Sequence, residues 1–480
     1  MNRQMIRYFL GWVLKIEAAL MIFPLIVCAV YKERETFYMA GIIVFIAAAG
    51  VLFTKKKPEN ASFFTREGYV AVALSWIILS VFGAMPFYQT DEIPSFTDAL
   101  FETISGFTTT GASILTDVNV LSHGVLFWRS FTHWIGGMGV LVFILAILPL
   151  TGADNIYIMR AESPGPSVGK LVPRVKSTAK ILYGIYIGIT LLMIVILCLT
   201  GMHPIEAMEI AFGSVGTGGF GVRNSSAAEY SMLQQGIITF FMIACGANFN
   251  VYFLLLAKKP KEAFGQEEVL SYLGILAFAS LSIAINIRGD FENFFTALHH
   301  ALFQVASCMT TTGFSTLDFD LWPTFSKMML ITVMFIGGCA GSTAGGFKVS
   351  RVVVLFKTIK KEMQSLIHPR AVKILKFEGK PIEHEVLRGI NVYFTTYVLT
   401  FIISLLLVSL DGKDLVTTVT AVIATFNNIG PGLAGAGPCA NFAHFSTFAK
   451  WVLMFDMLAG RLELFPILLM LLPRTWKRQY

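Results

Sequence analysis

Two stretches of the sequence are near copies of one another: ALFETISGFTTTG at Ala99–Gly111 and ALFQVASCMTTTG at Ala301–Gly313, with eight identities in thirteen positions. Two weaker copies share the outline, EAMEIAFGSVGTG at Glu206–Gly218 and TVTAVIATFNNIG at Thr418–Gly430. Each copy lies between two long apolar stretches. A unit repeated four times therefore controls the interpretation of the rest of the chain.

The predicted unit is an apolar span, a half-helix of about a dozen residues, a glycine-bearing loop and a second apolar span. The half-helices are too short to cross a hydrocarbon core of about 30 Å, so they must return to the face they came from. Irregular backbone at that depth is tolerated only where protein buries it or where it lines a watery cavity. Four such loops predict one shared central cavity. The flanking spans are expected near 68–88 and 125–149, 181–201 and 231–257, 270–287 and 326–356, and 389–410 and 448–472.

The composition is that of a membrane protein, because 55% of the 480 residues are hydrophobic and only 14% are charged. Two more spans precede the repeats, which gives ten, and no small-residue cleavage site marks the first as a removed signal peptide. We predict an all-α integral membrane protein with two N-terminal transmembrane helices, followed by four pseudo-symmetric helix–pore loop–helix repeats around one central pore. The expected divisions are 1–60 for the N-terminal pair, then repeats at 68–150, 180–257, 270–357 (with a broken second helix) and 388–473.

The basic residues segregate along the spans. With the N-terminus in the cytoplasm, 27 of the 37 Lys and Arg residues fall in inward segments, so the positive-inside rule places both termini in the cytoplasm. The net charge of +7 then needs no nucleic-acid partner. Acids on the opposite face, including Glu102 and Glu209, are expected to form a negative outer vestibule that concentrates cations.

The loops carry chemistry suited to a dehydrated cation. Backbone carbonyls can replace the water of an ion, glycine permits the backbone angles this requires, and threonine hydroxyls add oxygens. The alternative is that small residues only let helices approach closely. The predicted filter triplets are Thr109-Thr110-Gly111, Gly216-Thr217-Gly218, Thr311-Thr312-Gly313 and Asn428-Ile429-Gly430, with K⁺ contacting Thr109, Thr110, Gly216, Thr217, Thr311, Thr312, Asn428 and Ile429.

Three motifs carry a resemblance to a known family: TTTGAS at Thr108–Ser113, TTTGFS at Thr310–Ser315 and GGCAGSTAGGFK at Gly337–Lys348. They resemble the superfamily of potassium transporters that includes the Trk, Ktr and plant HKT proteins, and the N-terminal pair and length are similar to the Trk branch. The resemblance implies K⁺ uptake across a bacterial inner membrane, with K⁺ as the transported ion and no organic cofactor. A glycine in all four loops is associated there with K⁺, although NNIGPG in the fourth loop departs from the family pattern.

Five glycines interrupt the second span of the third repeat, where a continuous helix would be weak. The alternative is a glycine-rich packing face. The resemblance implies an intramembrane gating loop, with Arg461 in a GRLE context as a positive charge below the filter; Asp456 and Glu463 are its nearest acids in sequence, at poor helical spacings. The predicted gate residues are Gly337, Gly338, Gly341, Ser342, Thr343, Gly345, Gly346 and Arg461.

The resemblance also implies a homodimer and a cytoplasmic nucleotide-binding regulatory ring of the TrkA type. The basic segments Lys348–Arg388 and Thr151–Lys180 are candidate docking surfaces, or contacts to lipid headgroups.

Two rival functions remain open. A proton- or sodium-coupled cation symporter would need a titratable carboxylate along the path, and only Glu17 beside Lys15, Asp456 and Glu463 are candidates. A lipid-acting enzyme would need a clustered nucleophile, base or metal set, which the sequence does not offer, so we expect no enzyme. The histidine pair His299/His300 lacks a second cluster at metal-ligand spacing.

Overall fold

The computed structural model describes residues 1–58, 65–139, 175–369 and 374–477. These residues are mostly helical, and the strands among them form one antiparallel hairpin of β1 (Lys376–Phe377) and β2 (Lys380–Pro381). Six helical segments of the described chain are long and apolar enough to cross a membrane, or seven if one bent pair is counted as a single span. The predicted all-α membrane fold is therefore confirmed.

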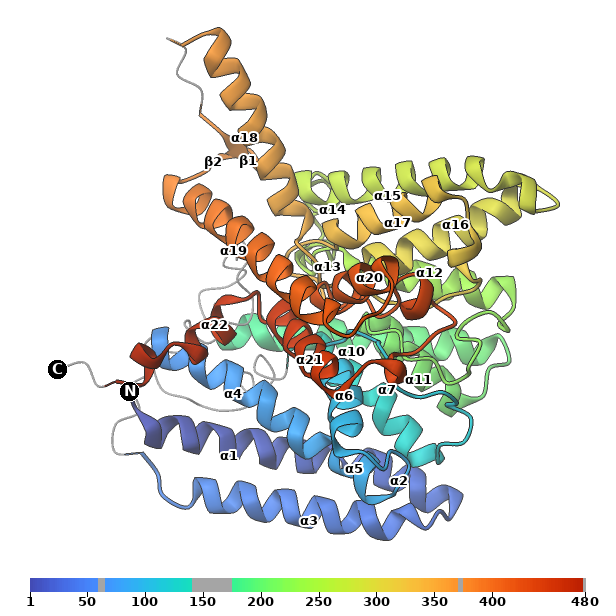
Figure 1. Ribbon diagram of the computed structural model, residues 1–480, viewed down its shortest axis with the longest axis vertical. Coiled ribbons are helices and arrows are strands. Elements are labelled where there is room, and N and C mark those ends of the chain that lie inside the picture. The colour runs from blue at the N-terminus through green and yellow to red at the C-terminus, as the bar shows by residue number, and fades with distance from the viewer. Residues whose placement is uncertain (59–64, 140–174, 370–373, 478–480) are drawn as a thin grey trace.

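The first three helices form the N-terminal layer: α1 (Arg3–Leu20), α2 (Ile22–Tyr31) and α3 (Glu35–Thr54). Helix α1 packs along α3, with Gly11 and Gly50 facing one another at the closest approach. The other side of α1 packs on α4 (Thr65–Gly83), which connects this layer to the rest of the molecule (Figure 1).

Four short helices lie between the long ones, as the repeat predicts for half-helices. Three begin at an N-cap side chain that accepts a backbone N–H, namely Ser95, Asn293 and Asp414, and the other has Pro204 in its first turn. They are α6 (Phe96–Phe107), α11 (Pro204–Val215), α16 (Phe294–Met309) and α20 (Leu415–Phe426). The helices that precede them are α4 with α5 (Met85–Gln89), α10 (Val175–Leu199), α15 (Glu267–Asn286) and α19 (His384–Ser409).

The helices that follow the half-helices are shorter than expected. The sequence predicted a break only in the third repeat, but the structure breaks each of the three that it describes fully. These pairs are α12 (Met232–Gly246) with α13 (Asn250–Leu256), bent by 96°, α17 (Thr324–Ile336) with α18 (Val349–Ile367), and α21 (Thr447–Arg461) with α22 (Phe465–Leu471). In the first repeat, α7 (His123–Gly137) ends two residues before the undescribed segment 140–174. The breaks in the second and fourth repeats therefore differ from the sequence prediction.

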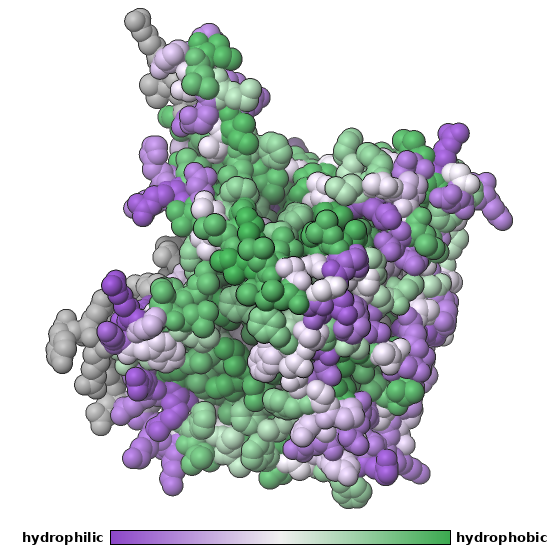
Figure 2. Space-filling view, viewed as in Figure 1, coloured by the Kyte–Doolittle hydropathy of each residue, from purple (hydrophilic) through white to green (hydrophobic). Residues whose placement is uncertain are grey.

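The two ends of the described chain lie on the same side of the molecule. The amino group of Met1 is 3.8 Å from Glu67, and the neighbouring Arg66 donates to the carbonyl of Lys477. Figure 2 shows hydrophilic residues at this edge and at the opposite edge, with hydrophobic residues over α19 and the middle of the view. This pattern suits a protein that crosses a membrane between the two edges.

Helix α18 projects beyond the main body together with the β1–β2 hairpin and the start of α19, whereas the rest of α19 packs on α20 and α21 (Figure 1). Short elements complete the chain: α14 (Pro260–Phe264), η1 (Arg288–Asp290), η2 (Phe319–Leu321), η3 (Ala434–Ala436), η4 (Phe442–His444) and η5 (Pro473–Trp476). Residues 140–150 of the first predicted repeat and 151–174 of one predicted docking segment lie outside the described residues.

Candidate ion-conduction site

The same backbone path follows each half-helix. We name the segments loop 1 (108–111), loop 2 (216–219), loop 3 (310–313) and loop 4 (427–430). The second residue of each has a left-handed φ: 54° at Thr109, 55° at Thr217, 55° at Thr311 and 56° at Asn428. The fourth is a glycine with a φ of 81°, 76°, 92° and 98° in the same order. In every loop the backbone N–H of the third residue donates a 2.8 Å hydrogen bond to a carbonyl oxygen in the last turn of the preceding half-helix.

This path is unfavourable for the residues that adopt it. A threonine with positive φ is an outlier, because its branched Cβ crowds the backbone, and such residues cost on the order of 1–3 kcal/mol each. Thr109, Thr217 and Thr311 nevertheless share this conformation. Strain repeated at equivalent positions is typical of a functional site.

The backbone corrects the register predicted for loop 2. The sequence alignment paired Gly218 with Gly111, but the backbone pairs Gly219 with Gly111 and Thr217 with Thr109. The physical reason is that the last position requires positive φ, which Gly219 has and Gly218 does not. Consequently Gly216 caps the half-helix, and the triplet equivalent to Thr109-Thr110-Gly111 is residues 217–219.

The four loops meet in a closed cycle of contacts. A Cβ built on Gly111 would lie less than 3.0 Å from the carbonyl oxygen of Gly218, closer than real Cβ atoms approach. The remaining three glycines each face the carbonyl of the equivalent third residue in the next loop. These contacts are Gly219 with Thr312, Gly313 with Ile429 and Gly430 with Thr110, which returns to loop 1. The four loops therefore surround one axis, and no side chain larger than hydrogen fits at the four glycines.

The carbonyls of this ring are not used by the protein backbone. Throughout the described residues, no backbone N–H donates to a carbonyl of residues 109–111, 217–219, 311–313 or 428–430, apart from any bond within a regular helix. Buried carbonyls are normally paired. A ring of unpaired carbonyls can instead coordinate a cation that has lost its water.

The hydroxyl groups follow a twofold rather than a fourfold pattern. Thr108 and Thr110 share a 2.8 Å hydrogen bond between hydroxyls in loop 1, and Thr310 and Thr312 share one of 2.7 Å in loop 3. Loop 2 has glycines at both equivalent positions. In loop 4 the amide of Asn428 reaches across to the Thr110 hydroxyl at 3.0 Å. Loops 1 and 3 alone supply the paired hydroxyls.

The segment between α17 and α18, residues 337–348, is irregular and lies against the ring. Gly345 donates a 2.6 Å hydrogen bond to the Thr311 hydroxyl, and Gly346 donates to the carbonyl of Asn427 at 3.1 Å. On the side of the second repeat, Cys339 donates to the carbonyl of Gly246 at 2.9 Å. We name these residues the intramembrane loop. Gly337, Gly341 and Gly346 have φ near 71–76°, so glycine is required at three of the predicted gate positions.

The remaining predicted gate residues lie within or beside this loop. Gly338 packs on Ala344. The Ser342 hydroxyl donates a 2.6 Å hydrogen bond to the carbonyl of Cys339, and the Thr343 hydroxyl donates a 3.2 Å hydrogen bond to the carbonyl of Cys245. These contacts hold the intramembrane loop together and attach it to the end of α12.

Arg461 lies at the end of α21 rather than in the middle of a continuous span. Its guanidinium donates to the Thr109 hydroxyl at 3.2 Å, to the carbonyl of Thr343 at 2.9 Å and to the carbonyl of Gly137 at 2.8 Å, and it also reaches Gly136. The side chain thus connects loop 1, the end of α7 and the intramembrane loop, mainly through carbonyl oxygens.

The acids considered near Arg461 in sequence have other partners. Glu463 pairs with Arg351, and Asp456 accepts a 2.5 Å hydrogen bond from Ser404. Glu17 is buried on α1, close to Gly83. None of these carboxylates belongs to a ring loop, so the ring itself contains no acid.

Other residues singled out in the sequence have ordinary structural contacts. His299 bonds Gln235 and His300 bonds Thr316, each at 3.0 Å. Among the described residues no cluster of His, Cys, Asp and Glu could hold a metal ion.

Two buried acids were missed or misplaced by sequence reasoning. Glu268 accepts a 2.6 Å hydrogen bond from Ala340, and so holds the intramembrane loop from α15. Glu102, expected in an open vestibule, is 0% exposed and pairs with Arg129 at 2.7 Å. No sequence signal marks Glu268, whereas Glu102 could have been noticed as a carboxylate within a half-helix.

Glu92 lies between α5 and α6, outside the membrane-spanning segments, and its side chain is partly buried. Burial raises the pKa of Glu92 to about 7, while its hydrogen bonds from Ser122 act in the opposite direction. The residue joins the start of α6 to the start of α7 at one edge of the molecule.

The chain resembles proteins of one family throughout. A family model described as TrkH, a cation transport protein, matches residues 34–285 and 293–477. The Trk system potassium uptake protein TrkH of Salmonella typhimurium is 34% identical over 489 residues, covering 99% of this chain and 100% of that protein. The Trk system potassium uptake protein TrkG of Escherichia coli is 31% identical over 483 residues, covering 98% and 97%.

A solved structure matches the fold as well. The crystal structure of the potassium transporter TrkH from Vibrio parahaemolyticus has a TM-score of 0.89 and 32% identity, with 99% of this chain and 100% of that chain covered. The match extends over both the N-terminal layer and all four half-helices.

Proposed function

Because this chain belongs to the TrkH family of cation transport proteins, we propose that it is the K⁺-selective, ion-conducting subunit of a potassium uptake system in a bacterial inner membrane. The family is one of transporters and not of enzymes. The observation that carries the proposal is the closed cycle of glycine–carbonyl contacts among the four loops. It brings unpaired carbonyls from four repeats to one axis.

The proposed filter consists of the four ring triplets, residues 109–111, 217–219, 311–313 and 428–430. Their carbonyl oxygens replace the water around K⁺, with added hydroxyl oxygens from loops 1 and 3. The half-helices α6, α11, α16 and α20 all end at this ring, and the partial negative charge at a helix C-terminus favours a cation there. At 100 mV, inside negative, each K⁺ gains about 2.3 kcal/mol on entry.

The proposed gate is the intramembrane loop together with Arg461. Hydrogen bonds from Gly345 and Gly346 attach the loop to loops 3 and 4, and Arg461 attaches it to loop 1 and α7. A polypeptide segment and a fixed positive charge on the cytoplasmic side of the filter would both hinder a cation. Opening then requires that these bonds be broken together.

The proposed assembly is a homodimer with a cytoplasmic, nucleotide-binding regulatory ring of the TrkA type. Helix α18 supports this, because it projects from the body with Phe356, Met363 and Leu366 exposed by 68%, 60% and 83%. A cavity of about 550 Å³ between α18 and α19 includes Lys361 and Arg388 in its lining. Both termini would be cytoplasmic, on the side that collects the basic residues.

The experiment that tests the function is cation flux into liposomes containing the purified chain. We expect uptake of K⁺ or ⁸⁶Rb⁺ in preference to Na⁺ at a fixed membrane potential, and we expect the substitutions Gly111→Ser, Gly219→Ser and Gly313→Ser to degrade it. Each adds a Cβ that meets a neighbouring carbonyl. The absence of cation flux, or flux indifferent to these glycines, would overturn the proposal and favour a coupled symporter.

A further inference from the structure

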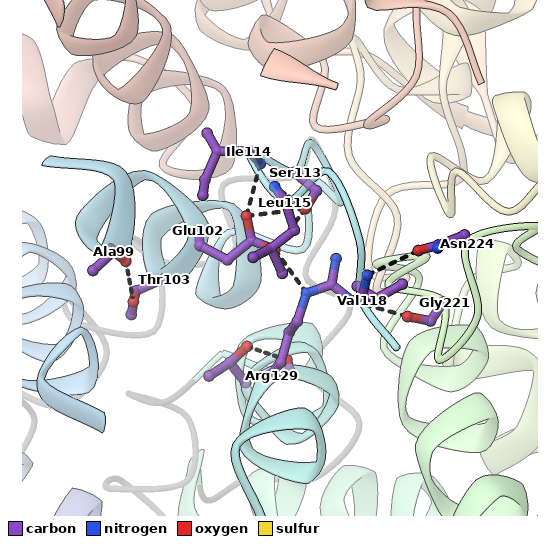
Figure 3. A network of polar contacts seen from close by, with 11 residues as sticks. Ala99, Glu102, Thr103, Ser113, Ile114, Leu115, Val118, Arg129, Gly221 and Asn224 are labelled. Carbon is purple, nitrogen blue, oxygen red and sulfur yellow. Dashed lines mark hydrogen bonds and ion pairs between the residues drawn. The ribbon is translucent and has the colours of Figure 1, made fainter. Parts of the chain in front are cut away.

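One buried ion pair lies directly behind two adjacent ring loops. Glu102, on α6, is 0% exposed, and Arg129, on α7, is 3% exposed. Arg129 Nε and Glu102 Oε1 are 2.7 Å apart (Figure 3). A buried pair of this kind gains little net stability, because removing both charges from water offsets their attraction. Stability of the fold therefore does not explain why this pair is placed behind the two loops.

The carboxylate of Glu102 holds the chain that leaves loop 1. It accepts hydrogen bonds from the hydroxyl of Ser113 at 2.9 Å and from the N–H of Ile114 at 2.9 Å (Figure 3). Ser113 is two residues beyond Gly111. The carboxylate thus fixes the distance between the half-helix and the outer end of its loop.

The guanidinium of Arg129 holds the chain that leaves loop 2. It donates a 2.9 Å hydrogen bond to the carbonyl of Gly221, two residues beyond Gly219 (Figure 3). It also lies over the ring of Phe220, 3.6 Å from the ring centroid. His133, one turn along α7, stacks on the same ring at 4.1 Å. Phe220 is therefore held by two side chains of the first repeat.

The pair consequently joins the outer ends of loops 1 and 2, and these are the loops in which Gly111 contacts the carbonyl of Gly218. The equivalent position on the other half-helices is occupied by Ile210, Gln304 and Ala421. Gln304 makes only a 3.4 Å hydrogen bond to Leu317. Among the described residues, the junction of loops 1 and 2 is the one at which an ion pair bonds the chain leaving each loop.

We propose that Glu102 and Arg129 are positioning residues that set the spacing of loops 1 and 2, and through it the preference of the ring for K⁺ over Na⁺. This inference rests on the proposed function. Neither side chain touches the ion. The pair acts by preventing loops 1 and 2 from closing around a smaller cation, because a carbonyl ring selects by the geometry it can hold.

The test compares permeability ratios and total K⁺ flux in the same liposomes. Glu102→Gln keeps the shape and removes the charge, and Arg129→Lys keeps the charge but cannot reach Glu102 and Gly221 at once. We expect the K⁺/Na⁺ ratio to fall about fivefold in each, the equivalent of one hydrogen bond of about 1 kcal/mol, while K⁺ flux persists. A ratio equal to that of wild type in folded protein would overturn the inference.

A second ion pair on the same half-helix provides the control. Lys450 and Asp98 are 2.6 Å apart and join α21 to the first turn of α6, away from the ring loops. Lys450→Gln should leave the ratio unchanged, and an equal fall in this variant would show a general effect of stability, contradicting the inference.

Ser113→Ala keeps the test decisive if the charge variants do not fold. It removes one hydrogen bond to Glu102 and leaves the ion pair intact, so a smaller fall in the ratio is expected, and an unchanged ratio argues against positioning by Glu102. Failure of the inference is distinguishable from failure of the proposed function, because the latter appears as absent K⁺ flux in wild type.

Discussion

Arg461 donates a 2.9 Å hydrogen bond from Nη1 to the carbonyl oxygen of Thr343, so the last residue of α21 holds the middle of the intramembrane loop. Replacing Arg461 with Ala removes this bond together with those to Thr109 and Gly137. Hydrogen bonds to a charged group contribute about 1.5–3 kcal/mol each, so we expect K⁺ flux to rise about tenfold or more. Liposome flux at fixed potential measures this.

The matched control for that variant is Arg474→Ala, because Arg474 is exposed in η5 and lies outside the ring and the intramembrane loop. Its flux should equal that of wild type. An unchanged flux in the Arg461 variant would remove this residue from the gate.

The register of loop 2 gives a second prediction. In Gly219→Ala the new Cβ meets the backbone carbonyl of Thr312, whereas in Gly218→Ala it meets the His133 side chain. Overpacking costs about 1–3 kcal/mol, so each single variant should lose about tenfold in flux. Adding His133→Ala should restore flux to the Gly218 variant only, since a backbone carbonyl cannot be removed. Restoration of the Gly219 variant instead would contradict the register.

Release of the intramembrane loop from α15 is a third prediction. Glu268 accepts hydrogen bonds from Ala340 at 2.6 Å and from Ser350 at 3.2 Å, near both ends of the loop. Glu268→Ala should raise K⁺ flux about tenfold by weakening the closed arrangement. The neighbouring Glu267→Ala, which loses contacts to Lys357 and Glu378 but none to the loop, should not. Equal K⁺ flux in the two variants would show that Glu268 does not hold the gate closed.

A fourth prediction concerns pH and stability. Because burial raises the pKa of Glu92 to about 7, the folded state binds a proton there more tightly than the unfolded state. The contribution of Glu92 to stability is therefore complete at low pH and falls as pH rises from about 4.5 to about 7. Thermal unfolding midpoints of Glu92→Gln should vary less across this range than those of wild type. Identical pH profiles would show that the pKa of Glu92 is the same in the folded and unfolded states, contradicting the shift.

The repeat architecture was predictable because each of its features depends on residues that are close together in the sequence. The start of a half-helix is marked in the sequence by an N-cap residue such as Ser95 or Asp414. A triplet such as Thr311-Thr312-Gly313 can be recognised from a short stretch of sequence. The break at residues 337–348 was predictable for the same reason, since five glycines weaken any helix.

The remaining features depend on contacts between distant residues. The break after Arg461 contains Glu463 and Leu464 at positive φ, where no glycine signals it, and the pairing of Glu463 with Arg351 fixes it from another repeat. The register of loop 2 depends on which of the adjacent Gly218 and Gly219 has a positive φ, and the sequence does not determine this. The pairing of Glu102 with Arg129 joins two helices that are separated by a loop.

The cycle of glycine contacts also limits how this molecule can change over evolutionary time. A displacement introduced at Gly111 is passed to Gly218, and from loop to loop it arrives back where it began, so the four loops must alter together or not at all. The third position enters this cycle of glycine contacts through its backbone carbonyl, and the four loops carry Thr110, Gly218, Thr312 and Ile429 there. Duplicated repeats joined in this way can diverge in chemistry while their chain trace stays the same.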